Sequence, residues 1–579
     1  MRDTTDTTEE TAYLARLAAL HAKNWPAGVP REVHYPLGRQ PVSDYLRERA
    51  RRQPDKPVIV FYGRELGFGE LDALSERFAA LLAARGVRRG DRVAVFMPNC
   101  PQFLVAFYGI LKLGAVHVPV NPLFKAEEVL YELRDSGAEV MLALDQLMDV
   151  ARAAREQGAL RHLFVTSFAD MRPEQPTLPL PAAVAAARIA CPDAEDLLPA
   201  LAATAPIALP PPGLDDVAAL NYTGGTTGLP KGCVHTQADM LYTAAATHGI
   251  SVDLREDDVG IGINPAFWIA GENALLIQPV FSGVTMVMLA RWDPVAWMMA
   301  VQRYRVSFAG LVLDSAVEVM EHPDVARYDL RSLRSMRVSS FVKKLGIGYR
   351  ERWHALTGTT MIEAAWGMTE THTNDSFTRG MQEGDFDLHA RPIFVGLPMP
   401  GTAFKVCDFD TGALLPLGSE GELCCRTPSL LKGYWNKPEA NAQTLRDGWL
   451  HTGDIAMLDE EGYLHFLGRR KEMLKVKGMS VFPAELEALL GMHPAVLGSG
   501  VVGRADADRG EVPVAFVRLD PAQAAGLTAE ALQDWCHARM ASYKVPEIRL
   551  VERLVTSATG KVLKNELTAL LARERGAAP

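Results

Sequence analysis

Short apolar runs alternate with longer segments in which apolar residues recur every three or four positions. Four consecutive segments show this pattern as helix, strand, helix and strand: Leu71–Arg85, Arg92–Met97, Pro101–Leu113 and Ala115–Val120. Such alternation predicts βαβ units, with a mainly parallel sheet and helices on both of its faces. A second α/β rhythm runs from residue 215 to about 365. Residues 170–213 are rich in alanine and proline and are typical of a surface segment.

The pattern changes in the last third of the chain. From Pro392 to Phe466 strands and tight turns dominate, with hairpin signals at Asp410–Gly412 and Asp459–Gly462. The last hundred residues alternate helix and strand again, over Glu485–Leu490, Gly498–Val502, Val512–Arg518 and Ala529–Met540. At the other end, residues 12–25 form an amphipathic helix candidate, which we expect to dock on the main body or on a second subunit.

These patterns define the expected fold. A chain of 579 residues is too long for one hydrophobic core, so two or more domains are expected. The prediction is an α/β protein whose large N-terminal domain has two α/β subdomains and a small β-barrel-like subdomain, followed by a small α+β C-terminal domain. The expected boundaries are an N-terminal extension 1–41, a large domain 42–470 with subdomains about 42–213, 214–391 and 392–470, and a C-terminal domain 471–579.

Composition narrows the function classes. The hydrophobic and charged fractions, 48% and 22%, are ordinary for a globular protein, and a net charge of −10 argues against a nucleic-acid partner. The seven cysteines form no CxxC pair, and adjacent Cys424 and Cys425 point to opposite faces of a strand, which suits a reducing cytoplasm. Polar and turn residues interrupt the longest uncharged stretch, Ala274–Ala290, so no membrane span is expected, and Met1–Thr11 does not resemble a signal peptide.

The stretch Tyr222–Gly232 carries the strongest chemical signal. It follows the strand-like run Val217–Leu220 and precedes a helix predicted to begin near Thr236. Its glycines let the backbone approach an anion closely, while hydroxyl groups of Thr223, Thr226 and Thr227 and the charge of Lys231 add donors. The contiguous Gly-Lys-Ser/Thr ending of a Walker loop is missing. We interpret the stretch as a cradle for nucleotide phosphates rather than a plain surface loop.

Four further stretches carry matching chemistry. Trp366–Thr371 supplies an aromatic ring that can stack on a purine, and its Glu370 can bind a magnesium ion. Gly448–Asp454 ends in a carboxylate that can accept hydrogen bonds from ribose hydroxyl groups. Gly468–Gly478 packs five cations around two glycines, and Thr559–Lys564 places Lys561 beside a glycine. Taken alone, Asp454 is also explained as a turn residue, the basic stretch as a solvated hairpin and Lys561 as a surface lysine. Their combination with the phosphate loop favours one nucleotide site.

From about Val42 to Leu567 the chain resembles the adenylate-forming superfamily of acyl-CoA and aryl-CoA synthetases, nonribosomal adenylation domains and luciferases. The phosphate loop, Trp366–Glu370, Gly448–Asp454, Gly468–Glu487 and Gly560-Lys561 match that superfamily in order and spacing. The resemblance implies an AMP-binding large domain, and a reaction in which a carboxylate attacks the α-phosphate of ATP and a thiol then displaces AMP. It implies ATP, Mg²⁺ and the co-substrate CoA.

The resemblance also assigns roles to residues of this chain. The loop residues Thr223, Gly224, Gly225, Thr226, Thr227, Gly228 and Lys231 would cradle the β- and γ-phosphates, with Thr226 and Glu370 at the metal. Trp366 and Gly367 would face adenine, Thr369 the α-phosphate, and Asp454 and Arg469 the ribose. Lys561 would bridge the carboxylate and the α-phosphate. A hinge at Lys471 would then rotate the mobile C-terminal domain, bringing Lys475, Lys477 and Gly478 to a thiol tunnel.

Two departures from the family pattern bear on the acid. Trp268 stands where the family usually has a histidine in Pro-x-Phe-His-x-x-Gly, and Ser339-Ser340-Phe341-Val342 replaces a stretch of small residues beside the acyl tunnel. The larger side chains could narrow the acyl pocket, Trp268 could act as a gate over a deep tunnel, or both sites could be repacked core. We expect Lys343 and Lys344 to face solvent. No cluster of basic residues marks a second carboxylate, so a monocarboxylic acid is the default.

The leading hypothesis is an AMP-forming carboxylic acid–CoA ligase that acts on a fatty or aryl monocarboxylate in the cytoplasm. A stand-alone enzyme that loads the phosphopantetheine of a carrier protein is the alternative, and a non-catalytic acyl-adenylate-binding protein is an alternative of another class. A luciferase-type oxidation on the same scaffold and a homodimer stay open. The identity of the acid cannot be predicted from these motifs.

Overall fold

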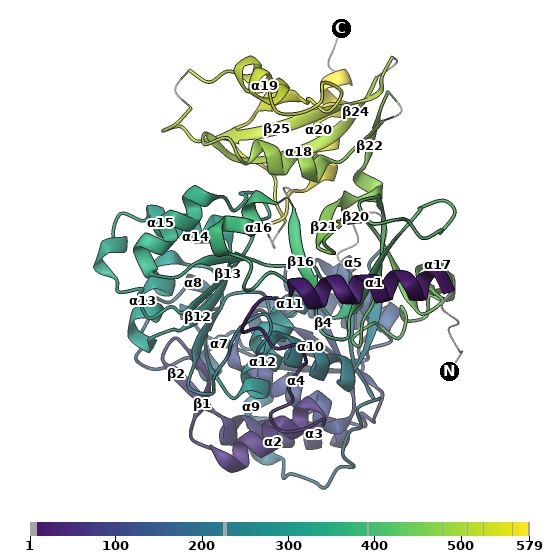
Figure 1. Ribbon diagram of the computed structural model, residues 1–579. Coiled ribbons are helices and arrows are strands. Elements are labelled where there is room, and N and C mark those ends of the chain that lie inside the picture. The colour runs from purple at the N-terminus through teal and green to yellow at the C-terminus, as the bar shows by residue number, and fades with distance from the viewer. Residues whose placement is uncertain are drawn as a thin grey trace.

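A computed structural model describes residues 8–223, 229–390, 393–477, 479–506, 508–524, 526–557 and 560–576. The described chain forms a large domain and a smaller C-terminal domain, which lies above it in Figure 1. The predicted mixed α/β architecture is confirmed, since parallel sheets with helices are followed by a β-rich region and a small α+β unit. None of the helices within these residues is both long and apolar enough to cross a bilayer.

The first sheet of the large domain has seven strands in the order β7-β6-β5-β3-β4-β8-β9. It is parallel except for the antiparallel pair β8–β9. Its strands are β3 (Arg92–Phe96), β4 (Val116–Val120), β5 (Val140–Leu144), β6 (His162–Thr166), β7 (Glu195–Asp196), β8 (Val217–Tyr222) and β9 (Gly232–Thr236).

The second sheet, also of seven strands, has the order β14-β13-β12-β10-β11-β1-β2. Its strands are β1 (Pro57–Phe61), β2 (Arg64–Gly67), β10 (Val259–Gly262), β11 (Thr285–Met288), β12 (Phe308–Val312), β13 (Ser335–Ser339) and β14 (Met361–Glu363). Because β1 pairs with β11 while β8 and β9 join the first sheet, the two sheets exchange strands across the division expected near residue 214.

Helices cover both sheets. They are α2 (Val42–Arg52), α3 (Phe68–Ala84), α4 (Pro101–Leu113), α5 (Ala126–Ser136), α6 (Met148–Glu156), α7 (Phe168–Met171), α8 (Ala182–Ala185), α9 (Leu197–Ala203), α10 (Gln237–Thr247), α11 (Ile269–Gly271), the π-helix η2 (Glu272–Ile277), α12 (Gln278–Ser282), α13 (Pro294–Tyr304), α14 (Leu313–Glu321), α15 (Ile347–Thr357) and α16 (Phe386–His389). Every residue of α4 is buried, as its almost uninterrupted apolar sequence requires.

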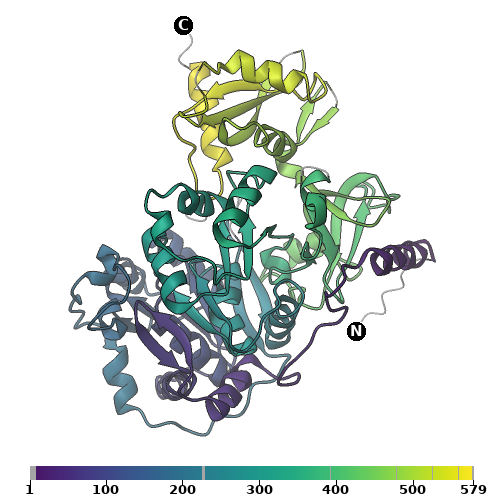
Figure 2. The same ribbon diagram turned by 60° about the vertical axis from the view of Figure 1, so that its left-hand side comes forward.

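The β-rich region forms a third sheet in the order β15-β16-β21-β20-β18-β17, with β19 on β20. Its elements are β15 (Ser376–Phe377), β16 (Phe394–Pro398), β17 (Ala403–Cys407), β18 (Glu420–Arg426), α17 (Pro438–Thr444), β19 (Leu445–Arg446), β20 (Trp449–Leu458) and β21 (Leu464–Arg469). The N-terminal helix α1 (Thr8–Asn24) docks here, beside the green strands in Figure 2, through pairs such as Arg16–Glu460 and Lys23–Glu461. This confirms docking on the main body.

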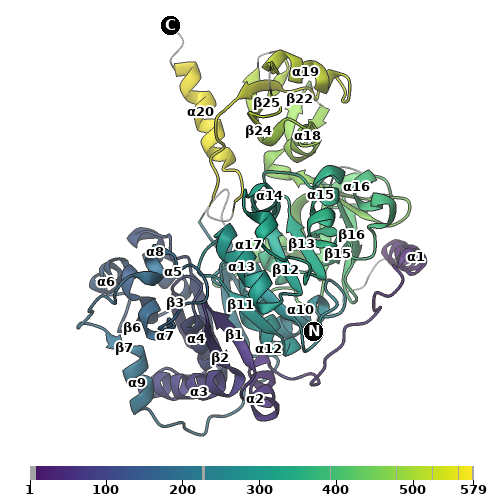
Figure 3. The ribbon, with the colours of Figure 1, turned by 90° about the vertical axis from the view of Figure 1, so that its left-hand side faces the viewer.

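The C-terminal domain has a sheet in the order β23-β22-β25-β24, with β26 parallel to β25. Its elements are β22 (Leu474–Val476), β23 (Met479–Val481), α18 (Pro483–Leu490), β24 (Val496–Asp506), β25 (Gly510–Leu519), α19 (Ala529–His537), β26 (Glu547–Leu550) and α20 (Lys564–Gly576). In Figure 3 the chain before α20 descends toward the large domain, and this stretch contains Lys561.

The helix predicted to begin near Thr236 is confirmed as α10, but a strand that the sequence did not predict precedes it. The chain does not pass directly from the loop into a helix, because β9 intervenes and forms a hairpin with β8, with Tyr222 opposite Gly232. Helix α10 begins only after β9, where Thr236 Oγ1 accepts the Asp239 N–H. The β-branched and apolar residues of Gly232–Thr236 favour a strand, which pairs with β8. The predicted residues Gly224, Gly225, Thr226, Thr227 and Gly228 lie outside the described residues, as does Gly478.

Candidate active site

A single cleft between the two domains collects the predicted site residues. Its volume is about 3090 Å³, well above the roughly 300–1,000 Å³ of a pocket for one small molecule. The described residues predicted for the site that line it are Thr223, Lys231, Trp268, Ser339, Ser340, Phe341, Trp366, Gly367, Thr369, Glu370, Asp454, Arg469, Lys471 and Lys561. Exposed Lys475 and Lys477 lie outside it, on and just after β22.

Tyr434 organises the phosphate end of this cleft. Its hydroxyl group donates to Glu370 Oε1 at 2.8 Å, and Lys231 Nζ lies 4.2 Å from the centre of its ring. Lys231 also closes the loop, since its N–H donates to Thr223 Oγ1 at 3.2 Å and its carbonyl oxygen accepts the Thr223 N–H at 3.0 Å. One aromatic side chain thus orients a cation and a carboxylate that the sequence assigned separately.

The Thr369 turn rests on a buried polar support. The turn is the 3₁₀ helix η4 (Thr369–Thr371), followed by His372 and Thr373 with positive φ angles of 58° and 87°. His235 Nε2 donates to the Thr369 carbonyl oxygen at 2.7 Å, and the Asn273 amide donates to the His372 carbonyl oxygen at 3.1 Å. Two consecutive left-handed non-glycine residues are strained, so they persist only where neighbours hold them.

Glu272 is the charged centre of this support. It is fully buried, with one oxygen 3.2 Å from His117 Nδ1 and the other 3.5 Å from His372 Nε2. Burial alone would raise the pKa of Glu272, but the two flanking imidazoles outweigh it and lower the pKa to about 2. Glu272 is therefore an ionised carboxylate behind the turn that carries Thr369.

Asp454 forms the ribose end. It lies on β20 opposite Arg469 of β21, whose Nε is 3.2 Å from Oδ1, and the Trp366 indole N–H donates to Oδ2 at 2.9 Å. Oδ1 has no aligned hydrogen-bond donor among the described residues. Burial raises the pKa of Asp454 to about 6, against the opposing effects of Arg469 and Trp366. A buried acceptor without a donor is suited to a ligand hydroxyl group.

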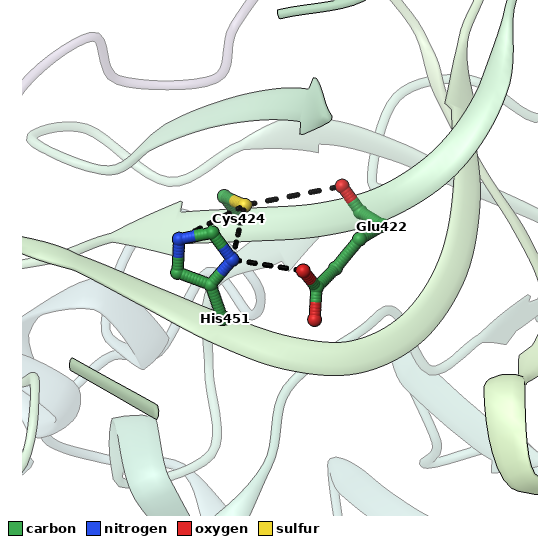
Figure 4. Close-up of side chains that lie close together, drawn as sticks. All are labelled: Glu422, Cys424 and His451. Atoms are coloured by element: carbon green, nitrogen blue, oxygen red, sulfur yellow. Dashed lines mark hydrogen bonds and ion pairs between the residues drawn. The ribbon is translucent and has the colours of Figure 1, made fainter. Parts of the chain in front are cut away.

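A second polar cluster fixes the turn before Asp454. Glu422 Oε1 accepts the Gly453 N–H at 3.2 Å, and Glu422 Oε2 lies 2.8 Å from His451 Nδ1 (Figure 4). Cys424 Sγ lies 3.4 Å from the same nitrogen, and ligand atoms of the three side chains lie within 4.8 Å of one another. Because the carboxylate already holds the imidazole and the Gly453 N–H, we interpret the cluster as a support for the Asp454 turn.

The two departures from the family pattern both contact Lys561. Its Nζ lies 5.6 Å from the ring centre of Trp268 and 5.4 Å from that of Phe341. Much of the Lys561 side chain remains accessible within the open cleft, yet the surrounding protein lowers its pKa by desolvation, and the Arg469 charge adds to this. The two aromatic faces flank the Lys561 amine, and desolvation by the walls of the cleft favours its uncharged form.

The segment after Phe341 docks the C-terminal domain. Val342 packs so closely on Gly498 of β24 that a Cβ atom there would lie 2.2 Å from Val342 Cγ1, and Lys344 packs on Gly491 in the same way at 2.8 Å. The expectation that Lys343 and Lys344 face solvent is therefore wrong, since both are half-buried. Sequence periodicity could not show this, because the partner surface lies about 150 residues further along the chain.

Known proteins with the same organisation were found by comparison. The model of the AMP-binding enzyme family matches residues 46–435, and the model of the AMP-binding enzyme C-terminal domain matches residues 485–561. The chain belongs to the AMP-binding enzyme family. It is 31% identical over 560 residues to a long-chain-fatty-acid–CoA ligase of Bacillus subtilis (strain 168), covering 94% of this chain and 97% of that protein.

Two further comparisons agree. The chain is 32% identical over 549 residues to 4-coumarate–CoA ligase 5 of Oryza sativa subsp. japonica, covering 92% of this chain and 95% of that one. The crystal structure of the anthranilate CoA ligase AuaEII with anthranoyl-AMP superposes with a TM-score of 0.79 at 27% identity, covering 93% of this chain and 98% of that one. This AMP-binding enzyme is accordingly an ATP-dependent acid–thiol ligase.

The motifs did not identify the residues that hold the site residues in place. Tyr434, Glu272 and His235 belong to no motif quoted from the sequence. They contact Glu370, His372 and Thr369, which lie 64, 100 and 134 residues away from them in the chain, respectively. The run Gly271-Glu-Asn273 inside an apolar segment was the one available signal, because a charged residue in a buried helix needs a partner.

Proposed function

We propose that this enzyme joins a carboxylic acid to CoA in two steps within the cleft. In the first, a carboxylate oxygen attacks the α-phosphorus of ATP, the bond to the pyrophosphate leaving group breaks, and an acyl-adenylate forms. In the second, the thiolate of CoA attacks the acyl carbon and AMP leaves. The observation that carries the proposal is that Lys561, Lys231, Glu370 and Asp454 face one cleft.

Each residue has a role in the first step. Lys231 and Thr223, with Gly224, Gly225, Thr226, Thr227 and Gly228, bind the β- and γ-phosphates, while Asp454 and Arg469 bind the ribose. Trp366 and Gly367 lie against adenine. Lys561 neutralises charge between the two approaching anions, which is worth a factor of roughly 10² to 10⁴ in rate.

The metal requirement fits the residues at hand. Glu370 presents a hard oxygen ligand to the cleft, steadied by Tyr434. Glu370 with Thr226 would hold Mg²⁺, which when bound neutralises phosphate charge.

Rotation of the C-terminal domain about Lys471 prepares the second step. Lys471 lies in the 3₁₀ turn η6 (Arg470–Glu472), between β21 of the large domain and β22 of the small one. The exposed Lys475 and Lys477, with Gly478, then replace Lys561 and line the path of the thiol. Trp268, Ser339, Ser340 and Phe341 border the acyl pocket throughout.

The experiment is ATP–pyrophosphate exchange with a panel of aliphatic and aromatic acids, followed by product mass with CoA or with a holo-carrier protein. We expect exchange with a subset of the acids and a CoA thioester as product. A thioester only on the carrier would favour the carrier-loading alternative, and no exchange with any acid would favour the binding protein. Gel filtration tests whether the protein forms a homodimer.

A further inference from the structure

Arg337 is a cation in the cleft that the proposed reaction does not use. It lies on β13, where Met336 and Val338 are fully buried in the core while Arg337 and Ser339 line the cleft. No hydrogen bond or ion pair joins its guanidinium group to another side chain in the part of the chain that the structure describes. Desolvation alone lowers the pKa of Arg337, and no nearby carboxylate compensates its charge among the described residues.

The surroundings of Arg337 leave room for a ligand. Its register partner on β12 is Gly310, and a Cβ atom at Gly310 would meet nothing within 4 Å. Its partner on β14 is the apolar Ile362. The carboxylate at the next position of β14, Glu363, is occupied, since it accepts the Ser340 N–H at 2.8 Å and the Ser340 hydroxyl group. Arg337 therefore faces free space rather than a counter-ion.

An unpaired guanidinium group in such a place is costly, and arginine cannot escape the cost by losing its proton at neutral pH. Proteins pair charges that are removed from water, so a half-buried charge without a partner in a cleft is a candidate for a functional site. The planar fork of arginine matches a carboxylate, which it binds through two parallel hydrogen bonds. The missing partner is thus expected to come from the substrate.

The position of Arg337 along β13 indicates which end of the substrate it would contact. Ser339 ends the strand beside the Lys561 site, and Arg337 lies two residues earlier, about 7 Å deeper along the strand. Lys561 serves the reacting carboxylate at the mouth, so Arg337 faces the far end of the acid. Resting on the proposed ligase function, we propose that the substrate is a dicarboxylic acid whose second carboxylate binds Arg337.

This proposal would replace the default of a monocarboxylate, which rested on the lack of a cluster of basic residues in the sequence. A single arginine in a strand gives no such cluster. The role of Arg337 depends on the neighbouring strands, whose residues Gly310 and Ile362 offer it no acidic partner.

The first test uses the wild-type enzyme alone. Pyrophosphate exchange is measured with succinate, glutarate and adipate, with their monomethyl esters, and with butyrate, valerate and hexanoate. We expect kcat/KM to fall roughly 10²-fold or more when the second carboxylate is esterified or replaced by a methyl group, because the guanidinium group then stays unpaired. Equal use of diacids and monoacids would overturn the inference.

The second test compares Arg337→Met and Arg337→Lys with Arg352→Met. Arg352 also lines the cleft, but Glu321 already lies 3.6 Å from it, so its loss is the matched control. Arg337→Met should invert the preference toward monoacids, Arg337→Lys should retain part of the diacid preference, and Arg352→Met should leave it unchanged. The dissociation constant for ATP alone reports whether each variant keeps its fold.

The two proposals fail differently. Exchange with no acid at all would overturn the ligase function together with the inference. Exchange whose diacid-to-monoacid ratio is the same in the wild type, Arg337→Met and Arg352→Met would overturn the inference alone.

Discussion

At the scale of single residues, the site combines groups with opposed requirements. Asp454 accepts hydrogen bonds from ribose hydroxyl groups best when it is ionised, yet its burial favours the protonated form and raises its pKa to about 6. Because this pKa lies above the ordinary value of 3.8, the protonated form stabilises the fold at low pH, and this stability is lost as the pH rises through about 6. Nucleotide binding follows the opposite trend.

The KM for ATP should therefore rise as the pH falls through about 6, because a neutral carboxyl group is a weaker acceptor. In Trp366→Phe the indole N–H that donates to Asp454 Oδ2 is lost, so the pKa of Asp454 rises. The pH at which KM begins to rise should then move up by about one unit. KM is measured by pyrophosphate exchange between pH 5 and 8. The titration of ATP itself is the same for both proteins. If KM depended on pH identically in the wild type and in Trp366→Phe, Asp454 would be ruled out as the titrating group.

Tyr434 offers a second residue-scale test. Tyr434→Phe keeps the ring near Lys231 but removes the donor to Glu370, and we expect about a 10-fold loss in exchange rate at limiting Mg²⁺. Tyr434→Leu also removes the aromatic face and should lose more. A Tyr434→Phe enzyme with unchanged Mg²⁺ dependence would show that the hydroxyl group does not steady Glu370.

Sequence reasoning found the residues that form motifs and missed those that act alone. Lys231, Glu370, Asp454 and Lys561 were predicted because glycine, threonine and charge occur together over a few positions. Arg337 and Tyr434 have no such local signature. Their environment is built by strands and loops distant in sequence, which no pattern along one segment can describe.

At the scale of elements, η2 supports the catalytic turn through Glu272. Its pKa of about 2 lies below the ordinary 4.5, so its contribution to stability is present above pH 4.5 and is lost as the pH falls toward 2. Glu272→Gln should lower the free energy of unfolding by about 3 kcal/mol at pH 7, because the buried imidazoles lose their anion.

Urea denaturation measures this difference, which should stay constant from pH 7 to 5. Glu460→Gln is the control, because Glu460 and its partner Arg16 are both mostly exposed. An equal effect of the two substitutions would contradict a special role for the buried carboxylate.

Element prediction succeeded where a periodicity is complete within one segment. Helix α4 was expected at Pro101–Leu113 and has those bounds, since Pro101 begins it and Gly114 ends it in a left-handed conformation. Strand β9 was missed because five residues between a glycine loop and a helix start carry too short a pattern. Its existence depends on hydrogen bonds to β8.

At the scale of the whole molecule, Val342 and Gly498 join the two domains in the arrangement that places Lys561 in the cleft. Gly498→Ala would put a methyl group 2.2 Å from Val342 Cγ1, so this arrangement should be disfavoured. We expect the adenylation rate to fall at least 10-fold, with a smaller loss in thioester formation from preformed acyl-adenylate. Rapid-quench measurement of the two half-reactions separates them.

Val342→Ala combined with Gly498→Ala restores the space and should recover most of the adenylation rate. Equal losses in both half-reactions, or no recovery in the double variant, would show that the contact does not select this arrangement.

Helix α1 has a practical consequence for anyone who prepares the protein. Glu10 accepts from the Trp449 indole N–H at 2.9 Å and from Lys405 Nζ at 2.6 Å, and Trp449 begins the strand that carries Asp454. An affinity tag fused close to residue 8, or trimming up to residue 24, would therefore disturb the nucleotide side of the cleft from behind. A purification handle belongs instead beyond α20, whose end lies far from α1 in the views of Figures 1 and 2.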